Sequence, residues 1–154
     1  MRRNDREVTD FNEIVDILKR ADTLHLGIFG EEFPYVVPLS YGFESSDGKI
    51  VFYVHGAAEG KKHDLISADS RICAEVSIFH RYAKTARSIT CEYESVIGYG
   101  RAERVYDNEA EHGIALLVSH CGYEGYDCPS KTLSHMTIYK ITLESFTGKR
   151  RFVD

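Results

Sequence analysis

The sequence predicts a mainly β fold, an antiparallel β-barrel with helices at its periphery. Segments rich in apolar, β-branched and aromatic residues recur along the 154-residue chain, separated by glycine, proline and turn residues. Only two or three segments carry apolar residues at helical spacing. Because six or seven strands in one small chain would leave exposed sheet edges, closure into a barrel is favoured over an open sheet. We expect a single domain spanning residues 1–154.

The first predicted element is a helix over Thr9–Ala21. Asp10 is placed to cap its first turn, and Glu13 follows three residues later, which is the spacing of a capping box. Apolar residues within the segment recur at helical spacing, so one face of the helix is apolar. We expect this face to pack on the rim of the sheet.

Three strands are expected to follow as an antiparallel meander, namely Leu24–Phe29, Pro34–Phe43 and Lys49–His55. Between the last two, Ser45–Gly48 has the composition of a hairpin turn whose glycine takes a positive φ. Pro38 lacks a backbone N–H, so its strand should be interrupted there or lie at a sheet edge. A broken ladder leaves backbone groups free for a ligand.

The second half of the chain adds two more helices and three strands. Gly98 and Gly100 allow one long strand to bend. Asp107 is placed to cap the last helix. The expected elements are, in order, helix Glu59–Asp69, strand Ile72–Phe79, strand Cys91–Tyr106, helix Asn108–His120, an irregular loop Cys121–Leu133 and strand Met136–Phe146.

Composition narrows the class of protein. The formal net charge of -5 disfavours a general nucleic-acid binder, which is usually basic. No stretch approaches the ~20 apolar residues that span a bilayer, and the charged N-terminus argues against a signal peptide. The 4 cysteines form no C-x-x-C pair, so we expect reduced thiols in a cytoplasmic protein. Two basic clusters, Lys61–Lys62 and Lys149–Arg151, can still serve a small anion.

The segment His55–His63, called the cradle below, is the leading candidate for a binding site. Its glycines and alanines let a ligand approach the backbone, and a helix N-terminus favours anions. Lys61 and Lys62 add positive charge. It is not a Walker A loop, because its glycines are too close together and no Ser or Thr follows the lysine. Tyr35–Tyr41 and Tyr93–Val96 offer a wall for a flat ligand, although these tyrosines could equally be core residues.

Five motifs stand in a specific order along nearly the whole chain. They are Arg2-Arg3 with Asp5-Arg6-Glu7, then Pro34–Tyr41, His55-Gly56-Ala57-x-x-Gly60-Lys61-Lys62, Tyr93-x-Ser95-Val96-Ile97-x-x-Gly100 and Thr147-Gly148-Lys149. Together they resemble the pyridoxamine-phosphate-oxidase-like flavoproteins, and among these the nitroimidazole-resistance (Nim-type) proteins.

The resemblance implies an FMN-binding split β-barrel that forms a homodimer with FMN at the interface. The cofactor-binding residues that it implies are Val37, Pro38, Leu39, Tyr41, His55, Gly60, Lys61, Lys62, Tyr93, Ser95 and Val96. His55 also matches a histidine proposed to take part in chemistry in the Nim-type subgroup. The implied function is an oxidoreductase in which FMN takes two electrons from a donor and passes them to a small organic acceptor such as a nitroaromatic compound. No Rossmann fingerprint is present, so a nicotinamide donor would bind transiently.

Other interpretations remain. The basic segment Thr147–Asp154 does not match the substrate-phosphate site of pyridoxamine phosphate oxidases, so that activity is not expected. A non-catalytic protein that stores or senses flavin or haem, with a histidine as axial ligand, is the alternative function. A metal site formed by His112, His120, Cys121 and Cys128 is disfavoured, because ligand pairs on one helix are usually four residues apart and these histidines are eight apart.

Overall fold

The computed structural model describes residues 3–153, except for the side chains of residues 130 and 131. Arg2 of the first motif therefore lies outside the described residues. The elements are a 3-10 turn η1 (Asn4–Arg6), β1 (Glu7–Val8), α1 (Phe11–Arg20), β2 (Leu24–Ile28), β3 (Tyr35–Leu39), β4 (Tyr41–Ser46), β5 (Lys49–Ala57), α2 (Lys61–Ala68), β6 (Arg71–Lys84), β7 (Ile89–Val105), α3 (Asp107–His120), α4 (Ser130–Leu133) and β8 (Met136–Arg151).

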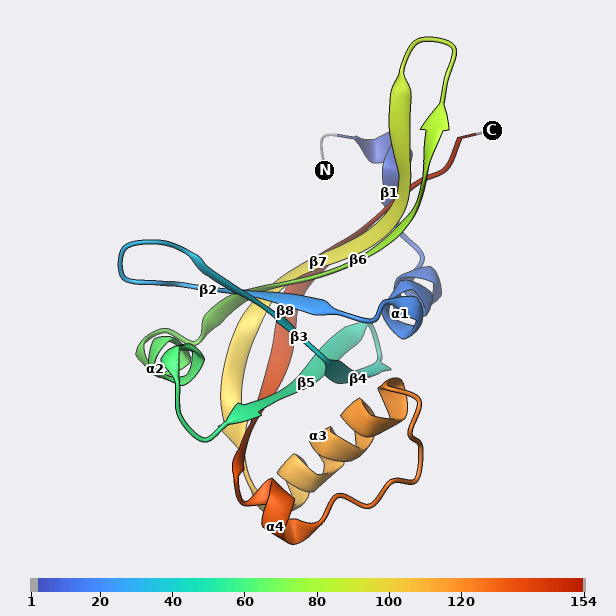
Figure 1. Cartoon of the computed structure of the whole chain (residues 1–154). Coiled ribbons are helices and arrows are strands. Elements are labelled where there is room, and N and C mark those ends of the chain that lie inside the picture. Colours follow the sequence, from blue (N-terminus) through green and yellow to red (C-terminus); the bar gives the residue numbers. More distant parts are fainter. Residues whose placement is uncertain (1–2, 154) are drawn as a thin grey trace.

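The strands form one antiparallel sheet, in the order β3-β2-β6-β7-β8-β5-β4, and β1 pairs with β8. β3 and β4 follow each other along the chain, separated by Ser40, yet they form opposite edges of the sheet. The sheet curls around its core without closing (Figure 1). This arrangement confirms the predicted split β-barrel and makes β3 a strand with one open backbone edge.

The meander predicted between Leu24 and His55 is wrong. The chain forms two separate hairpins, β2–β3 and β4–β5, because the strand pairing is interrupted at Ser40, shortly after Pro38. Pro38 lies in the edge strand β3, as its missing N–H requires. The predicted hairpin turn is confirmed, with Asp47 and the glycine after it at φ values of 50° and 75°, which are typical of a type I′ turn.

β6 and β7 form a long hairpin that projects away from the barrel (Figure 1). The predicted strand ended at Phe79, but the pairing continues to Lys84 because a bulge at His80 absorbs the change of register. A second irregularity lies at the predicted bend, where Glu144 of β8 is out of register opposite Gly100. Because of these bends, β6 and β7 form part of the barrel and also continue beyond it as the projecting arm.

The core fills the inside of the curled sheet and is covered by α1. The carboxylate of Asp10 accepts the amides of residues 12 and 13, which confirms the predicted cap. Tyr41 is fully buried, and its hydroxyl lies 2.7 Å from the carbonyl oxygen of Leu18 and 2.9 Å from that of Ala21. The tyrosine therefore ties the end of α1 to β4.

α3 packs closely on β4 and β5. A Cβ on Gly42 would lie 2.2 Å from the amide nitrogen of Leu117, so only glycine permits this approach. The cap predicted at Asp107 is wrong, because Tyr106 occupies the cap position and Asp107 is the first helical residue, with φ 49° and no side-chain capping bond. Within residues 3–153, no helix combines the length and apolar character needed to cross a bilayer.

Candidate functional site

The cradle lies where β5 ends and α2 begins. Gly60 holds φ at 136°, and its carbonyl accepts the amide of His63 at 2.8 Å and that of Asp64 at 3.4 Å. The amides of Lys61 and Lys62 have no backbone acceptor among residues 3–153. These free donors stand at a helix N-terminus, where the helix dipole favours a bound anion.

Lys62 turns back from the helix onto the strand. Its ammonium donates to the carbonyl oxygen of His55 at 3.0 Å, and burial lowers its pKa. A Cβ on Gly56 would lie 2.6 Å from this ammonium, so the glycine leaves the space that Lys62 occupies. Lys62 thus fixes the cradle to the end of β5.

Lys61 connects the cradle to the open edge strand. Its ammonium lies 5.2 Å from the centre of the Tyr35 ring, over the ring face. Tyr35 is the first residue of β3, whose outer backbone edge has no strand partner. The structure therefore brings two of the predicted regions together, the cradle and the stretch beginning at Tyr35.

Two half-buried histidines flank the cradle. Burial, and then the nearby charge of Lys62, lower the pKa of both His55 and His63, so both imidazoles are neutral at pH 7. The Nδ1 atom of His63 lies 2.9 Å from the hydroxyl of Tyr139, and the two rings stack at 5.6 Å. Burial raises the pKa of Tyr139, so its hydroxyl keeps its proton.

A cavity of about 460 Å³ opens beside His55. Its lining residues are His55, Gly56, Ala57, Thr132, His135 and Met136. Sequence reasoning did not place Thr132, His135 or Met136 beside His55, because nothing in their spacing indicates that β8 begins opposite the end of β5. The pairing of Ala57 with Met136 places them here.

The predicted residues of β3 and β4 divide between the two faces of the sheet. Val37 and Leu39 pack against the core, whereas Pro38 is exposed. The side chain of Tyr41 is committed to the core, as described above. Within one protomer, Val37 and Leu39 can therefore meet a surface ligand chiefly through the open backbone edge of β3, and the Tyr41 ring is a structural residue.

The residues predicted on β7 lie away from the cradle. His55 pairs with Ile138, which pairs in turn with Val105 at the end of β7. Tyr93 lies twelve residues before Val105, about 40 Å along the strand. Ser95 shares the half-exposed face of Tyr93, but Val96 points inward with 2% of its surface exposed.

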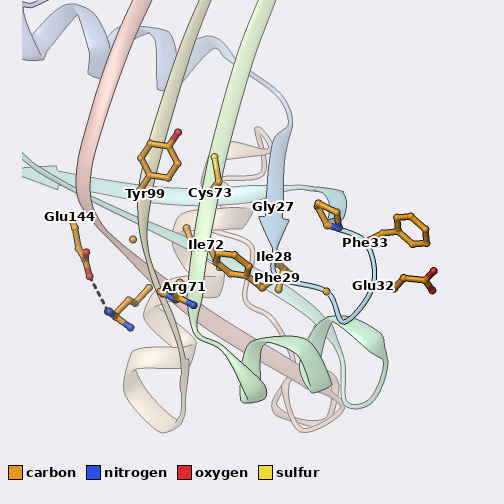
Figure 2. Close-up of a pocket in the computed structure, with 14 residues that line it drawn as sticks. Gly27, Ile28, Phe29, Glu32, Phe33, Arg71, Ile72, Cys73, Tyr99 and Glu144 are labelled. Atoms are coloured by element: carbon orange, nitrogen blue, oxygen red, sulfur yellow. Dashed lines mark hydrogen bonds and ion pairs between the residues drawn. The ribbon is translucent and has the colours of Figure 1, made fainter. Parts of the chain in front are cut away.

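A cavity of about 490 Å³ lies elsewhere, on the outer face of β2, β6 and β7. Figure 2 shows Cys73 and Tyr99 on neighbouring strands, the Phe29 ring beside Arg71, and Phe33 on the β2–β3 connection. The two arginines that line it are paired, Arg71 with Asp69 and the other with Glu144. Burial raises the pKa of the Cys73 thiol, which disfavours the nucleophilic thiolate form.

The histidines of the disfavoured metal site have other partners. His112 contacts Glu44 at 2.9 Å, and His120 lies 2.9 Å from the carbonyl oxygen of Ala21. In the part of the chain that the structure describes, no three His, Cys, Asp or Glu side chains are grouped to hold a metal ion. The four cysteines at positions 73, 91, 121 and 128 are free thiols.

The sequence of the chain matches a known protein family. Residues 10–150 match the family described as pyridoxamine 5'-phosphate oxidase. The chain belongs to this family. A comparison with curated protein sequences gives no match.

Solved structures of similar fold agree with the family assignment. A proposed 5-nitroimidazole antibiotic resistance protein from Bacteroides thetaiotaomicron is 25% identical, with a TM-score of 0.82 over 93% of this chain and 85% of that one. The flavocytochrome Anf3 from Azotobacter vinelandii is 20% identical, with a TM-score of 0.78 over 99% and 72%. A FAD and haem binding protein from Mycobacterium smegmatis is 13% identical, with a TM-score of 0.80 over 96% and 74%.

Proposed function

We propose that the chain is an FMN-dependent oxidoreductase that transfers electrons from a nicotinamide or similar donor to a small organic acceptor, with nitroaromatic compounds as the first class to test. The observation that carries the proposal is the cradle, in which two free amides and the ammonium of Lys61 stand beside the open edge of β3. The similarity to a proposed nitroimidazole resistance protein supports the acceptor class.

The chain's own groups fit FMN. The amides of Lys61 and Lys62 and the Lys61 ammonium would hold the phosphate, and the small residues around Gly60 let it approach the backbone. The free backbone groups of β3 would contact the polar edge of the ring system. Bound FMN would supply reversible two-electron chemistry. His55, neutral and half-buried at the cradle, would offer one hydrogen bond to the cofactor or the acceptor.

A homodimer completes this site. Tyr93 and Ser95 are too far along β7 to reach the cradle of their own protomer, so a second copy would have to supply them. Their half-exposed face belongs to the outer side of the sheet, which also exposes Ile97 and Tyr99. An apolar outer face of this kind suits burial against another copy. Analytical ultracentrifugation should give the mass of a dimer, and a monomer would overturn this part of the proposal.

Cofactor binding is tested by the visible spectrum and by FMN titration of the purified protein. We expect flavin bands as purified or after addition of FMN. Lys61→Ala together with Lys62→Ala should weaken FMN binding about a hundredfold, because the Lys61 ammonium no longer contacts the phosphate and the Lys62 ammonium no longer fixes the cradle to β5. Lys84→Ala, which removes an exposed lysine from the arm, should leave the affinity unchanged. No flavin binding, or unchanged affinity in the double variant, would refute the cradle as the FMN site.

Turnover is tested separately. The flavin-loaded protein should oxidise a reduced nicotinamide in the presence of a 5-nitroimidazole, with loss of the nitro absorbance. Flavin binding without turnover of any acceptor in a small screen would leave the cofactor assignment standing and refute the oxidoreductase.

Haem binding is a second candidate, favoured by one observation. His55, in β5, and His135, directly before β8, line the same cavity together with Met136. A neutral imidazole is the form that ligates iron, and the pKa of His55 is lowered. A Soret band that shifts in His55→Ala and His135→Ala, but not in His25→Ala, would favour this function.

A further inference from the structure

We propose that a pocket between η1 and the end of β8 binds a small organic oxyanion through Arg6 and Arg151. The pocket has a volume of about 410 Å³. It is lined by Asp5, Arg6, Arg150, Arg151, Phe152 and Val153. This is the basic cluster at Lys149–Arg151 that the proposed flavin function leaves without a role.

Two of the charged groups around this pocket are already neutralised. Asp5 accepts two hydrogen bonds from the guanidinium of Arg3, at 2.7 Å and 2.6 Å. Arg150 donates to Glu94 at 2.7 Å and to Glu13 at 3.0 Å. These pairs contribute little attraction for a further anion.

Unlike Asp5 and Arg150, the side chains of Arg6 and Arg151 are not neutralised by close ion pairs in the described part of the chain. The Nε atoms of both are buried and have no hydrogen-bond partner among residues 3–153. The carboxylate nearest to Arg6 is that of Asp5, at 4.0 Å and already engaged by Arg3. Buried polar atoms in native proteins almost always have a partner, so two buried guanidinium nitrogens without a hydrogen-bond acceptor in one pocket indicate a missing ligand. A guanidinium recognises planar or tetrahedral oxyanions through two parallel N–H donors.

The pocket also limits the size of the ligand. Its volume falls within the usual range of small-molecule sites of ~300–1,000 Å³, which exceeds what a bare inorganic anion needs. Phe152, with 54% of its surface exposed, offers an apolar face beside the arginines. A carboxylate or phosphate group attached to a small ring satisfies both features.

This pocket is separate from the cradle of the same protomer. Met136, at the start of β8, pairs with Ala57 of the cradle, and Arg151 ends the same strand. Fifteen residues separate the two, about 50 Å along the strand. The cradle of the same protomer therefore takes no part in this pocket.

Isothermal titration calorimetry tests the proposal in chloride buffer, with phenyl phosphate, benzoate and inorganic phosphate as probes. We expect saturable binding of one phenyl phosphate or benzoate per chain, tighter than that of inorganic phosphate. The tighter of the two organic probes assigns a phosphate or a carboxylate ligand. Arg6→Gln and Arg151→Gln should each weaken binding at least about tenfold.

Two controls locate the site. Arg87→Gln removes the same charge from the exposed arm and should bind as tightly as the wild type. Lys61→Ala with Lys62→Ala should also retain binding, which excludes capture of the probe by the cradle. The proposal is overturned by absence of saturable binding, by an equal loss in Arg87→Gln, or by binding that arises only after Asp154→Asn, because the Asp154 carboxylate would then be the missing acceptor.

Discussion

Two basic clusters, one beside the start of β8 and one at its end, differ in what their cations contact. At the start of the strand, beside the cradle, Lys62 is held by a backbone carbonyl and Lys61 by an aromatic ring, so neither cation meets a carboxylate. At the far end, Arg150 is bound by the buried carboxylate of Glu94, while the buried Nε of the adjacent Arg151 has no hydrogen-bond partner in the described chain. Basic clusters that look alike in sequence therefore have different roles. Some of their cations are available to bind a ligand, and others form structural ion pairs.

The difference follows from strand geometry. Successive side chains of a strand point to opposite faces, so neighbours such as Arg150 and Arg151 enter different environments. Glu94 is 2% exposed and is reached by Arg20, Arg150 and His80 from three other elements. Burial raises its pKa, but the three hydrogen bonds outweigh burial and lower it to about 2. A buried carboxylate is tolerated here because its acceptors are saturated.

The largest effect is expected from breaking this network. Glu94→Gln leaves two arginines without their shared carboxylate and should lower the free energy of unfolding by about 3 kcal/mol, measured by urea denaturation. Glu144→Gln, which removes an exposed carboxylate paired with Arg101, should cost less than about 0.5 kcal/mol. If both variants lost the same unfolding free energy, Glu94 would contribute no more than a carboxylate in an exposed ion pair.

The pH dependence gives an independent check on Glu94. A carboxyl whose pKa is lowered by folding stabilises the protein above its ordinary pKa of 4.5 and loses that contribution as the pH falls toward about 2. The stability difference between wild type and Glu94→Gln should therefore shrink over this interval. A constant difference would mean that the ionised carboxylate is not what stabilises the fold.

At the cradle, Gly60→Ala is expected to have the next largest effect on stability. A side chain at φ 136° is strained, so the substitution should cost about 1–2 kcal/mol in unfolding free energy. It should also weaken FMN, because the free amides after Gly60 would move. Gly48→Ala, at φ 75° in a distant turn, should cost stability while leaving FMN affinity unchanged.

Substitutions of the neighbouring residues Arg150 and Arg151 are expected to have smaller effects on stability, and these effects should differ from each other. Arg150→Gln should lower the free energy of unfolding by about 1 kcal/mol, since Glu13 loses its partner and Glu94 keeps two of three. Arg151→Gln should leave stability unchanged or slightly raised, because it removes an unpaired buried donor. The reverse order, read from denaturation curves, would contradict the assignment of roles.

The smallest effect concerns the histidines of the cradle. NMR titration of the imidazole resonances should place the midpoints of His55 and His63 below 6.5. Because folding lowers these pKa values, their contribution to stability is present above about pH 6.5 and is lost as the pH falls through the lower folded values. Midpoints at or above 6.5 would show that burial does not control either group.

The sequence alone predicted most elements that depend on local chemistry. The helix capped by Asp10, the turn at Asp47-Gly48, the edge position of Pro38 and the helix after Gly60 follow from caps, turn residues and the missing proline N–H. These signals act over a few residues, so they can be read without a fold. The ordered motifs further predicted the family, which the match over residues 10–150 shows.

Long-range pairing decided the remaining features. The two edges formed by β3 and β4, the extension of β6 past His80 and the placement of His135 beside His55 depend on which strands pair and in what register. The choice of Arg150 for Glu94, leaving Arg151 free, likewise depends on which face each side chain meets. Sequence determined which groups were available, and tertiary structure determined their partners, because hydrogen bonds and ion pairs act only between atoms that the fold brings together.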